Sequence, residues 1–440
     1  MSLASPEGIT VLKIVSGQKP REIAAQILHR RHEGAFIEDL LETTLARAAL
    51  SPADRRLCQE LVYGIVRWQS TLDWLIDRKT GNRPQKPQLR DLLRLGLYQI
   101  FWLDRIPNHA AVHETVQLAK HFRLNTQAGF VNAVLRGYLR EFDVTRTLLN
   151  ELKMTQPAIG YSHPDWLVAR WQERWGSELA GQLMDWNNHP PKTFARVNTL
   201  KADAGKLVTQ WRDENVEYDF VRRDWLEENL VFELKSHPPL ATLPSFVQGQ
   251  FYIQDPGALL AVRVLDPQPG ETILDLCAAP GGKLTHMAQL MRNESTLVAH
   301  DVSPQRLKLL EENCARLGVT GVQSVLRLDP QTSPRFDRIL LDAPCSNTGV
   351  MRRRVDLRWR IRSEEITRLR AMQLTLLNQA AALLKPGGTL VYSTCSLEPE
   401  ENDEVVKEFL AGHPALKLES TRELLPFANA VDGAYVALLK

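Results

Sequence analysis

Residues 275–283 read DLCAAPGGK and lie between an apolar run, TILDLC (272–277), and a helix-like run, LTHMAQLM (284–291). Small residues in a turn between a strand and a helix let the backbone approach a ligand closely. The N-terminus of the helix that follows favours an anionic group, such as a carboxylate. Glycine-rich turns are common, so this stretch by itself predicts a strand, a turn and a helix, with a ligand at the turn.

The same succession of a strand-like run and a helix-like run continues through the C-terminal part of the chain, from about residue 248. Strand-like runs alternate there with helix-like runs, and this alternation predicts a parallel sheet that is covered on both faces. The strand-like runs are TILDLC, TLVAHD (296–301), QSVLRLD (323–329), FDRILLDAP (336–344) and GTLVYSTCS (388–396). Ligands bind at the carboxyl ends of the strands in such a sheet.

Two acidic residues stand at the ends of the second and third predicted strands. Asp301 follows Gly281 by 20 residues, the place from which a carboxylate can accept hydrogen bonds from both ribose hydroxyls. Asp329 ends the third strand, where contacts to the adenine side would fall. Together with the loop, these residues favour a nucleoside ligand. The alternative for each aspartate is a strand-end cap.

Cys345 and Cys395 follow the fourth and fifth predicted strands. If these strands are neighbours, their axes lie about 4.8 Å apart, so both thiols should face one cleft beside the first loop. A buried cysteine is usually an inert small hydrophobe, which we expect of Cys58 and Cys314 on apolar helix faces. Cys277, inside the loop, fits either role.

The two segments before residue 248 differ from this pattern. Residues 1–150 show helical periodicity, including one face from Leu57 to Leu75 after a capped start at Ser51, and predict an all-α bundle. Residues 155–247 combine short β-like runs with a helix-like run, which predicts a small α+β domain. Six of the 10 tryptophans fall between Trp166 and Trp225, and we expect a packed aromatic core there rather than a base-stacking platform.

The composition bounds the function. The 440 residues allow two to four domains, and 44% hydrophobic with 24% charged residues exclude a mostly disordered chain. The formal net charge of +2 excludes a uniformly basic coat but permits a local basic patch. No run approaches the roughly 18 apolar residues of a membrane span, and no secretory signal is recognisable. Five cysteines without a CxxC pair indicate free thiols, no disulfide framework and no metal site.

Several motifs together carry a family resemblance. CAAPGGK, DAPCS with TG two residues on, and TCS followed by PEEN resemble the RNA cytosine-5 methyltransferases. The N-terminal IPNHAAVHETV and FVNAVLR resemble the NusB-like domain of their bacterial Fmu/Sun branch, whose members act on small-subunit ribosomal RNA. The resemblance covers about residue 20 to the C-terminus. It implies a NusB-like helical RNA-binding domain (1–150), a small α+β domain (155–247) and a Rossmann-like catalytic domain (248–440).

The resemblance also implies the cofactor and the roles of the site residues. The cofactor would be S-adenosyl-L-methionine. Cys395 would attack cytosine C6, Cys345 would assist product release, Asp342 would stabilise the adduct and Lys283 would position the base. The residues assigned to the cofactor are Cys277, Ala278, Ala279, Pro280, Gly281, Gly282, Lys283, Asp301 at the ribose, Arg306, Asp329 near the adenine and Asp342 at the methionine end. On geometry alone either thiol could attack.

Residues 352–362 contain six arginines and Trp359, a combination that suits phosphate contacts and base stacking. We assign Arg352, Arg353, Arg354 and Trp359 to RNA binding, and Arg196 on weaker grounds. The alternative is a solvated, arginine-rich start of a helix.

The leading hypothesis is a cytoplasmic, monomeric enzyme that methylates cytosine C5 in 16S ribosomal RNA, with neither a metal nor a membrane involved. The alternative among enzymatic functions is the same reaction with transfer RNA as the substrate. DNA cytosine methylation would use Cys345 as nucleophile and would not need Cys395. A non-catalytic NusB-like RNA-binding protein would need neither the cofactor loop nor the paired thiols.

Overall fold

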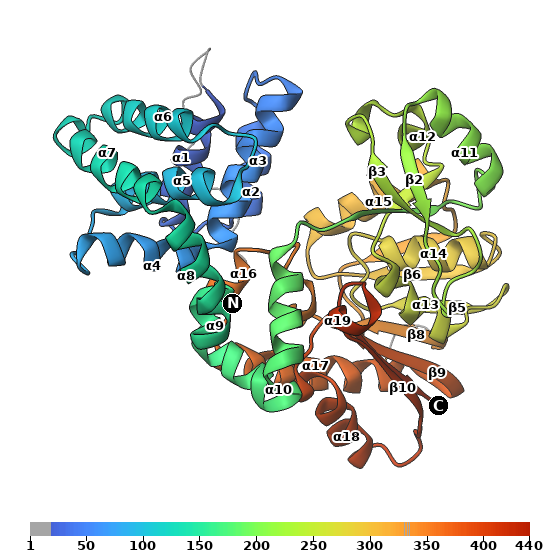
Figure 1. The fold of residues 1–440 in the computed structure, drawn as a ribbon. Helices are drawn as coiled ribbons and strands as arrows, with labels where there is room; N and C mark the ends of the chain where they lie inside the picture. The colour runs from blue at the N-terminus through green and yellow to red at the C-terminus, as the bar shows by residue number, and fades with distance from the viewer. Residues whose placement is uncertain (1–18, 330, 332, 334) are drawn as a thin grey trace. The chain divides into compact units, whose positions relative to one another are not determined.

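The computed structural model describes residues 19–329, 331, 333 and 335–440 (Figure 1). Contacts divide these residues into two units, which are described separately. The helical unit comprises residues 19–189 and 352–360, and the sheet unit comprises 190–351 and 361–440.

The helical unit confirms the predicted all-α bundle: among its described residues there is no strand. Helix α5 (Pro87–Trp102) is buried on nearly every side and forms the centre around which the other helices pack. The other helices of this unit are α1 (Pro20–Arg31), α2 (Ile37–Leu45), α3 (Pro52–Arg67), α4 (Gln69–Thr80), α6 (Asn108–His121), α7 (Asn125–Arg140), α8 (Phe142–Thr155), α9 (Pro157–Gly160), α10 (Asp165–Asn188) and α16 (Leu357–Arg360).

One local expectation is corrected in this unit. The apolar stripe from Leu57 to Leu75 predicts a single helix, but the chain breaks at Trp68, whose φ of −99° and ψ of 20° are not helical. α3 therefore ends at Arg67, and α4 begins one residue later. The start of α3 is as expected, because the Ser51 hydroxyl accepts a hydrogen bond from the backbone N–H of Asp54.

Residues 352–360 pack inside the helical unit although they follow the fourth large-sheet strand in sequence. Val355 joins the helical core. The buried Asp356 carboxylate accepts hydrogen bonds from Arg31 Nε at 2.6 Å and from Arg360 Nε at 2.8 Å. We call residues 352–360 the docked segment.

The small α+β domain is built on a four-stranded antiparallel sheet in the order β2-β3-β1-β4. Its elements are β1 (Thr193–Val197), α11 (Ala204–Asp213), β2 (Glu217–Phe220), β3 (Val231–Ser236), η1 (Leu240–Thr242), α12 (Pro244–Val247) and β4 (Phe251–Ile253). Trp211 is fully buried against Phe232 and Phe251, which confirms an aromatic core here. Contacts divide the chain after His189, whereas the sequence places the start of this domain near 155, so the predicted boundaries stay predictions.

The large sheet has seven strands in the order β10-β11-β9-β8-β5-β6-β7. They are β5 (Thr272–Asp275), β6 (Thr296–His300), β7 (Val322–Val325), β8 (Phe336–Asp342), β9 (Leu384–Thr394), β10 (Leu418–Leu424) and β11 (Ala434–Leu439). The five predicted strands are parallel, as expected. β10 and β11 add an antiparallel edge that the sequence did not predict, because β10 is mostly exposed and lacks a buried alternation.

Helices cover both faces of this sheet, as predicted. Along β5, Ile273 packs with α13 (Leu260–Leu265), α14 (Gly282–Leu290) and α15 (Pro304–Leu317). The next residue, Leu274, packs on the opposite face with α17 (Ser363–Leu383) and α18 (Asp403–Ala411). The short elements of this region are η2 (Pro256–Leu259), η3 (Thr348–Val350), η4 (Pro399–Glu401) and α19 (Pro426–Asn429).

Over residues 19–329, 331, 333 and 335–440, no helix combines the length and the apolar character that a membrane crossing requires.

Candidate active site

The glycine-rich loop connects the end of β5 to the start of α14. Gly281 has a φ of +98°, in the region that favours glycine, and a Cβ there would lie 3.1 Å from the side chain of Leu310. α14 then begins at Gly282. The predicted strand, turn and helix are therefore confirmed, and both the backbone conformation and the available space require a glycine at the turn.

This loop borders a hollow of about 210 Å³. The hollow is lined by Tyr252, Ile253, Gln254, Asp275, Cys277, Ala278, Ala279, Pro280, Gly282, Lys283 and Asp342. Seven of these residues belong to the predicted cofactor set. Sequence reasoning missed Asp275 and the three residues from β4 and its end. Asp275 could have been found as an acidic residue that ends a buried strand, but residues 252–254 carry no such local signal.

Asp275 is the least satisfied polar group at this hollow. Among the described residues, neither of its carboxylate oxygens accepts a well-formed hydrogen bond, although the side chain is buried; the backbone N–H of Cys277 is a nearby donor that acts on its pKa. Burial, followed by the nearby Asp342 carboxylate, raises the pKa of Asp275 to about 8. A ligand that carries a hydrogen-bond donor or a positive charge would satisfy this carboxylate.

A second polar cluster lies at the ends of β8 and β9. Lys283 Nζ is 2.6 Å from Asp342 Oδ2, and the hydroxyl of Ser393 donates to Asp342 Oδ1 at 2.8 Å. Burial alone would lower the pKa of Lys283, but Asp342 and Cys395 outweigh it and raise the pKa. The Lys283 ammonium is therefore held by Asp342 and lies close enough to Cys395 to interact with it electrostatically.

The two predicted thiols meet, as the parallel neighbouring strands require. Cys345 Sγ and Cys395 Sγ lie 3.3 Å apart, and Cys395 Sγ also donates to Asn347 Oδ1 at 3.1 Å. Hydrogen bonding to Cys395 and burial raise the pKa of Cys345 well above its ordinary value. Cys395 is the less buried of the two. The pair thus consists of one enclosed thiol that retains its proton and one more accessible thiol beside a lysine.

Glu401, in the PEEN motif, ties together the two loops that carry these thiols. Its buried carboxylate accepts hydrogen bonds from the backbone N–H of Ser346 at 2.8 Å and from the hydroxyls of Ser346 and Ser396. Each serine directly follows one of the cysteines. The sequence showed the motif but not this contact.

Gly349, in the TG pair, allows the cysteine loops to close. Its N–H donates to the carbonyl of Cys395 at 2.9 Å, and a Cβ at this position would lie 2.7 Å from that same oxygen. The close approach of the two backbones requires glycine.

The residues predicted around the ribose and adenine do not line the hollow itself. Asp301 is buried at the end of β6, where it accepts from the N–H of Ser303 and lies 2.9 Å from Arg306 Nη1. Arg306 also donates to the carbonyl of Ala279, so it links Asp301 to the loop. Asp329 lies four residues beyond β7 and is exposed. Their contacts with a cofactor stay predictions.

Two of the predicted RNA-binding arginines are inside the protein. The Arg352 guanidinium lies 4.0 Å from the centre of the Trp186 ring and is buried. Arg196 is fully buried and donates to the carbonyl of Gly282 at 2.7 Å. The expectation that these two side chains face RNA is therefore wrong, because both are engaged in contacts within their own units.

The remaining predicted RNA contacts lie in the docked segment. The Trp359 indole N–H donates to the carbonyl of Val66 at 2.7 Å, which turns the ring toward the helical core rather than toward a base. Arg353 is half-buried and Arg354 is exposed. RNA binding by these two arginines stays a prediction.

Three family models match the chain. A model described as 16S rRNA methyltransferase RsmB/F matches residues 262–440, the NusB family model matches residues 18–140, and a ferredoxin-like domain model of RsmF/B-like methyltransferases matches residues 163–233. The last match begins before α10, the helix whose contacts fall within the helical unit.

Solved structures with this fold include the crystal structure of PH0851, with a TM-score of 0.77 and 29% identity over 98% of this chain and 99% of that one. The crystal structure of NSun6 from Pyrococcus horikoshii with SFG has a TM-score of 0.57 and 25% identity, covering 63% of this chain and 98% of that one.

Among curated proteins, the probable ribosomal RNA small subunit methyltransferase B of Bacillus subtilis (strain 168) is 39% identical over 406 residues, which is 90% of this chain and 88% of the relative. With this identity over nearly the whole length of both proteins, the chain belongs to the ribosomal RNA small subunit methyltransferase B family.

Proposed function

We propose that this protein methylates cytosine C5 in 16S ribosomal RNA, with S-adenosyl-L-methionine as the methyl donor and Cys395 as the nucleophile. The observation that carries the proposal is the pair of thiols 3.3 Å apart beside the Lys283–Asp342 ion pair. The name of the Bacillus subtilis relative supports ribosomal RNA as the substrate class.

The residues at the hollow fit the cofactor. The Asp275 carboxylate, which accepts no well-formed hydrogen bond, suits the amino group or the positive charge of the methionine end. The glycine turn leaves room for a ligand close to the backbone. The structure of NSun6 contains SFG, an analogue of S-adenosylmethionine, which supports the same cofactor here. When bound, S-adenosylmethionine supplies an electrophilic methyl group to cytosine C5.

Cytosine C5 is a weak nucleophile, and the thiol of Cys395 is placed to activate it. With Lys283 stabilising its thiolate, Cys395 Sγ forms a bond to C6, and the electrons of the C5–C6 double bond move toward C5. Once C5 carries the methyl group, a base removes the C5 proton. The electrons of that C–H bond re-form the C5–C6 double bond, and the bond between sulfur and C6 breaks with its electrons returning to Cys395. Cys345, which retains its proton, donates a hydrogen bond to the departing Cys395 thiolate. Asp342 stays beside Lys283 and orients its charge throughout.

Single substitutions of the two thiols test these roles. Cys345→Ala should still permit attack but slow the release of Cys395, so protein covalently joined to RNA should accumulate as a slow band on a denaturing gel. Cys395→Ala should give no such band and no transfer of labelled methyl to RNA. The double variant Cys345→Ala/Cys395→Ala is the control and should also lack the band.

The opposite pattern, with a band from Cys395→Ala alone, would exchange the two roles. Labelled methyl transfer to small-subunit ribosomal RNA should exceed that to transfer RNA under matched conditions. A preference for transfer RNA would overturn the proposed substrate, and transfer to neither RNA would overturn the enzymatic proposal.

A further inference from the structure

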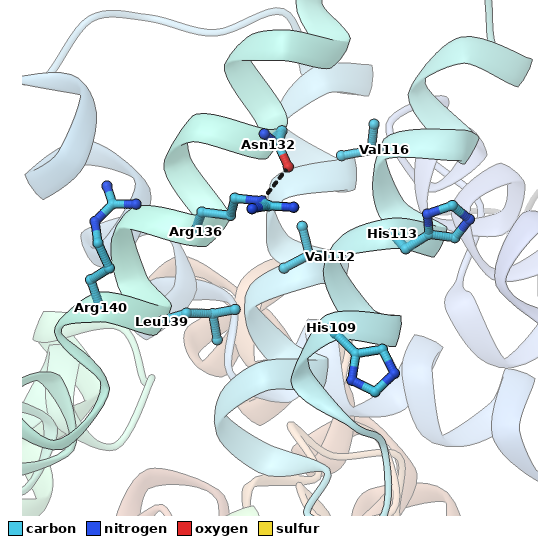
Figure 2. Close-up of a pocket in the computed structure, with 8 residues that line it drawn as sticks. All are labelled: His109, Val112, His113, Val116, Asn132, Arg136, Leu139 and Arg140. Atoms are coloured by element: carbon cyan, nitrogen blue, oxygen red, sulfur yellow. Dashed lines mark hydrogen bonds between the residues drawn. The ribbon is translucent and has the colours of Figure 1, made fainter.

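Helices α6 and α7 of the helical unit enclose a hollow of about 390 Å³ between their side chains (Figure 2). We call it the α6–α7 groove. It is lined by His109, Val112, His113 and Val116 from α6, and by Asn132, Arg136, Leu139 and Arg140 from α7. The spacings of three, four, seven and eight residues place each set on one face of its helix. The hollow lies outside the candidate active site, which belongs to the sheet unit.

The rim of this groove carries two arginines and two histidines. His109, His113, Arg136 and Arg140 are all exposed. Arg136 Nε donates to Asn132 Oδ1 at 3.0 Å (Figure 2). Within the part of the chain that the structure describes, His109, His113 and Arg140 make neither a hydrogen bond nor a salt bridge, and no carboxylate lines the groove. Their charges and donors are therefore available to an external anion.

Two acidic residues near this groove have basic partners outside it. Residues 104–141 contain five lysines and arginines and three acidic residues, Asp104, Glu114 and Glu141. Glu114 lies 3.6 Å from Lys19 Nζ, and Glu141, which follows α7, lies 2.7 Å from Lys79 Nζ. The lining of the groove itself includes two arginines and no acidic residue, which favours an anionic partner.

The floor of the groove is apolar. Val112 is buried, and Val116 and Leu139 are partly buried beneath the cationic rim. An aliphatic floor below arginines matches a nucleotide, whose base or ribose can pack on the floor while its phosphate accepts hydrogen bonds from guanidinium groups. The volume also falls within the roughly 300–1,000 Å³ typical of small-ligand sites.

The groove also gives a physical role to two motifs that the active site leaves unused. IPNHAAVHETV supplies all four lining residues from α6, and FVNAVLR supplies Asn132 and Arg136 from α7. We propose that the α6–α7 groove binds the sugar–phosphate backbone of the RNA substrate, with Arg136 and Arg140 each contacting a phosphate. This inference rests on the proposed function, because it takes RNA as the substrate.

Charge removal in the full-length protein tests the groove. Arg136→Ala/Arg140→Ala should lower the slope of log affinity against log salt by about two units for a small-subunit ribosomal RNA fragment, about one per lost phosphate contact. The matched control, Arg47→Ala/Arg56→Ala, removes two exposed arginines of the same unit outside the groove and should leave the slope unchanged.

A nearly isosteric variant tests the site without truncating a side chain. Asn132→Asp places a carboxylate against Arg136 and should reduce the salt slope by about one unit. Thermal melts would confirm that each variant folds. Salt slopes equal to that of the unmodified protein in both groove variants would overturn the inference.

Three further outcomes separate this inference from its alternatives. If binding weakens only for assembled small-subunit particles and not for naked RNA, the groove binds a protein, and the inference is wrong. If the unmodified protein transfers no methyl group to RNA, the proposed function fails. If it does transfer methyl but the groove variants bind RNA as it does, only the groove assignment fails.

Discussion

At the level of single residues, the two thiols of the site differ in their burial and in their neighbours. Cys345 retains its proton because it is enclosed and hydrogen-bonded to Cys395, whereas Cys395 lies nearer to solvent and to Lys283. Two residues of the same type, placed at equivalent strand ends, thereby acquire different chemistry. The sequence offered both thiols as candidates, and burial distinguishes them.

Asp275 provides a test of this electrostatic environment through pH. Its folded-state pKa, about 8, lies above the ordinary value, so the folded protein binds more protons than the unfolded chain between these values, and stability falls as pH rises. The substitution Asp275→Asn removes this loss of stability, because an amide does not ionise. The variant should gain stability relative to the unmodified protein between pH 5 and 8, by on the order of a few kcal/mol, in thermal melts without cofactor.

Asp337→Asn is the matched control, for which the expected change in stability has the opposite sign. Lys385 and the N–H of Thr272 lower the pKa of Asp337, so its contribution is present near neutral pH and is lost as pH falls through the lowered value. This variant should be less stable than the unmodified protein at pH 7, with a difference that shrinks below about pH 4. If Asp275→Asn behaved in the same way, Asp275 would be ionised and paired in the folded state.

At the scale of elements, strands of the small sheet support the glycine loop of the large one. Arg196, on β1, donates to the carbonyl of Gly282 and to the hydroxyl of Thr285 at 3.0 Å, both at the start of α14. Arg196 also bonds to Gln254, which lines the hollow, and lies over the ring of Tyr252. Arg196 is therefore a positioning residue for the cofactor loop rather than an RNA contact.

Arg196→Met should loosen this support and weaken S-adenosylmethionine binding by about tenfold, or about 1.4 kcal/mol, as measured by calorimetric titration. Arg196→Lys keeps one positive charge and should recover part of the affinity. Lys192→Ala, which changes an exposed residue just before the same strand, is the control and should bind as the unmodified protein does. A purely structural role would lower the melting temperature of Arg196→Met and leave the affinity unchanged.

At the scale of the whole molecule, the docked segment makes the helical unit depend on residues that follow the thiol loop in sequence. The Asp356 carboxylate accepts hydrogen bonds from Arg31, from Arg360 and from the backbone N–H of Ile37. The Arg358 guanidinium donates hydrogen bonds to the carbonyls of Arg67 and Ser162. These groups are buried or nearly so, and removal of one partner leaves an uncompensated charge.

Asp356→Asn should therefore destabilise the helical unit by about 3–5 kcal/mol, because Arg31 and Arg360 lose their buried counter-ion. Calorimetry should show earlier unfolding of that unit. Glu33→Gln makes the same acid-to-amide change at an exposed residue of the unit and should alter stability by less than about 1 kcal/mol. Equal, small effects of the two substitutions would mean that the docked segment contributes little to stability.

The order of the elements and the residue types at the strand ends could be read from the amino-acid sequence. Alternating strand and helix runs specify a parallel sheet, and strands that run in the same direction bring their carboxyl ends to one edge. Cys345, Cys395 and the glycine loop could therefore be placed together before any coordinates were known. The edge strand β10 was not predicted because it is mostly exposed and therefore carries no hydrophobic alternation.

The burial of individual polar residues and the identity of their contacts became apparent from the folded structure. Arg358 meets the carbonyl of Arg67 across 291 residues of sequence, and Arg196 meets that of Gly282 across 86. An arginine-rich stretch looks the same in sequence whether its side chains reach solvent or distant carbonyls. Local pattern reports periodicity and residue type, whereas burial depends on partners from remote segments, and these partners exist only once the chain has folded.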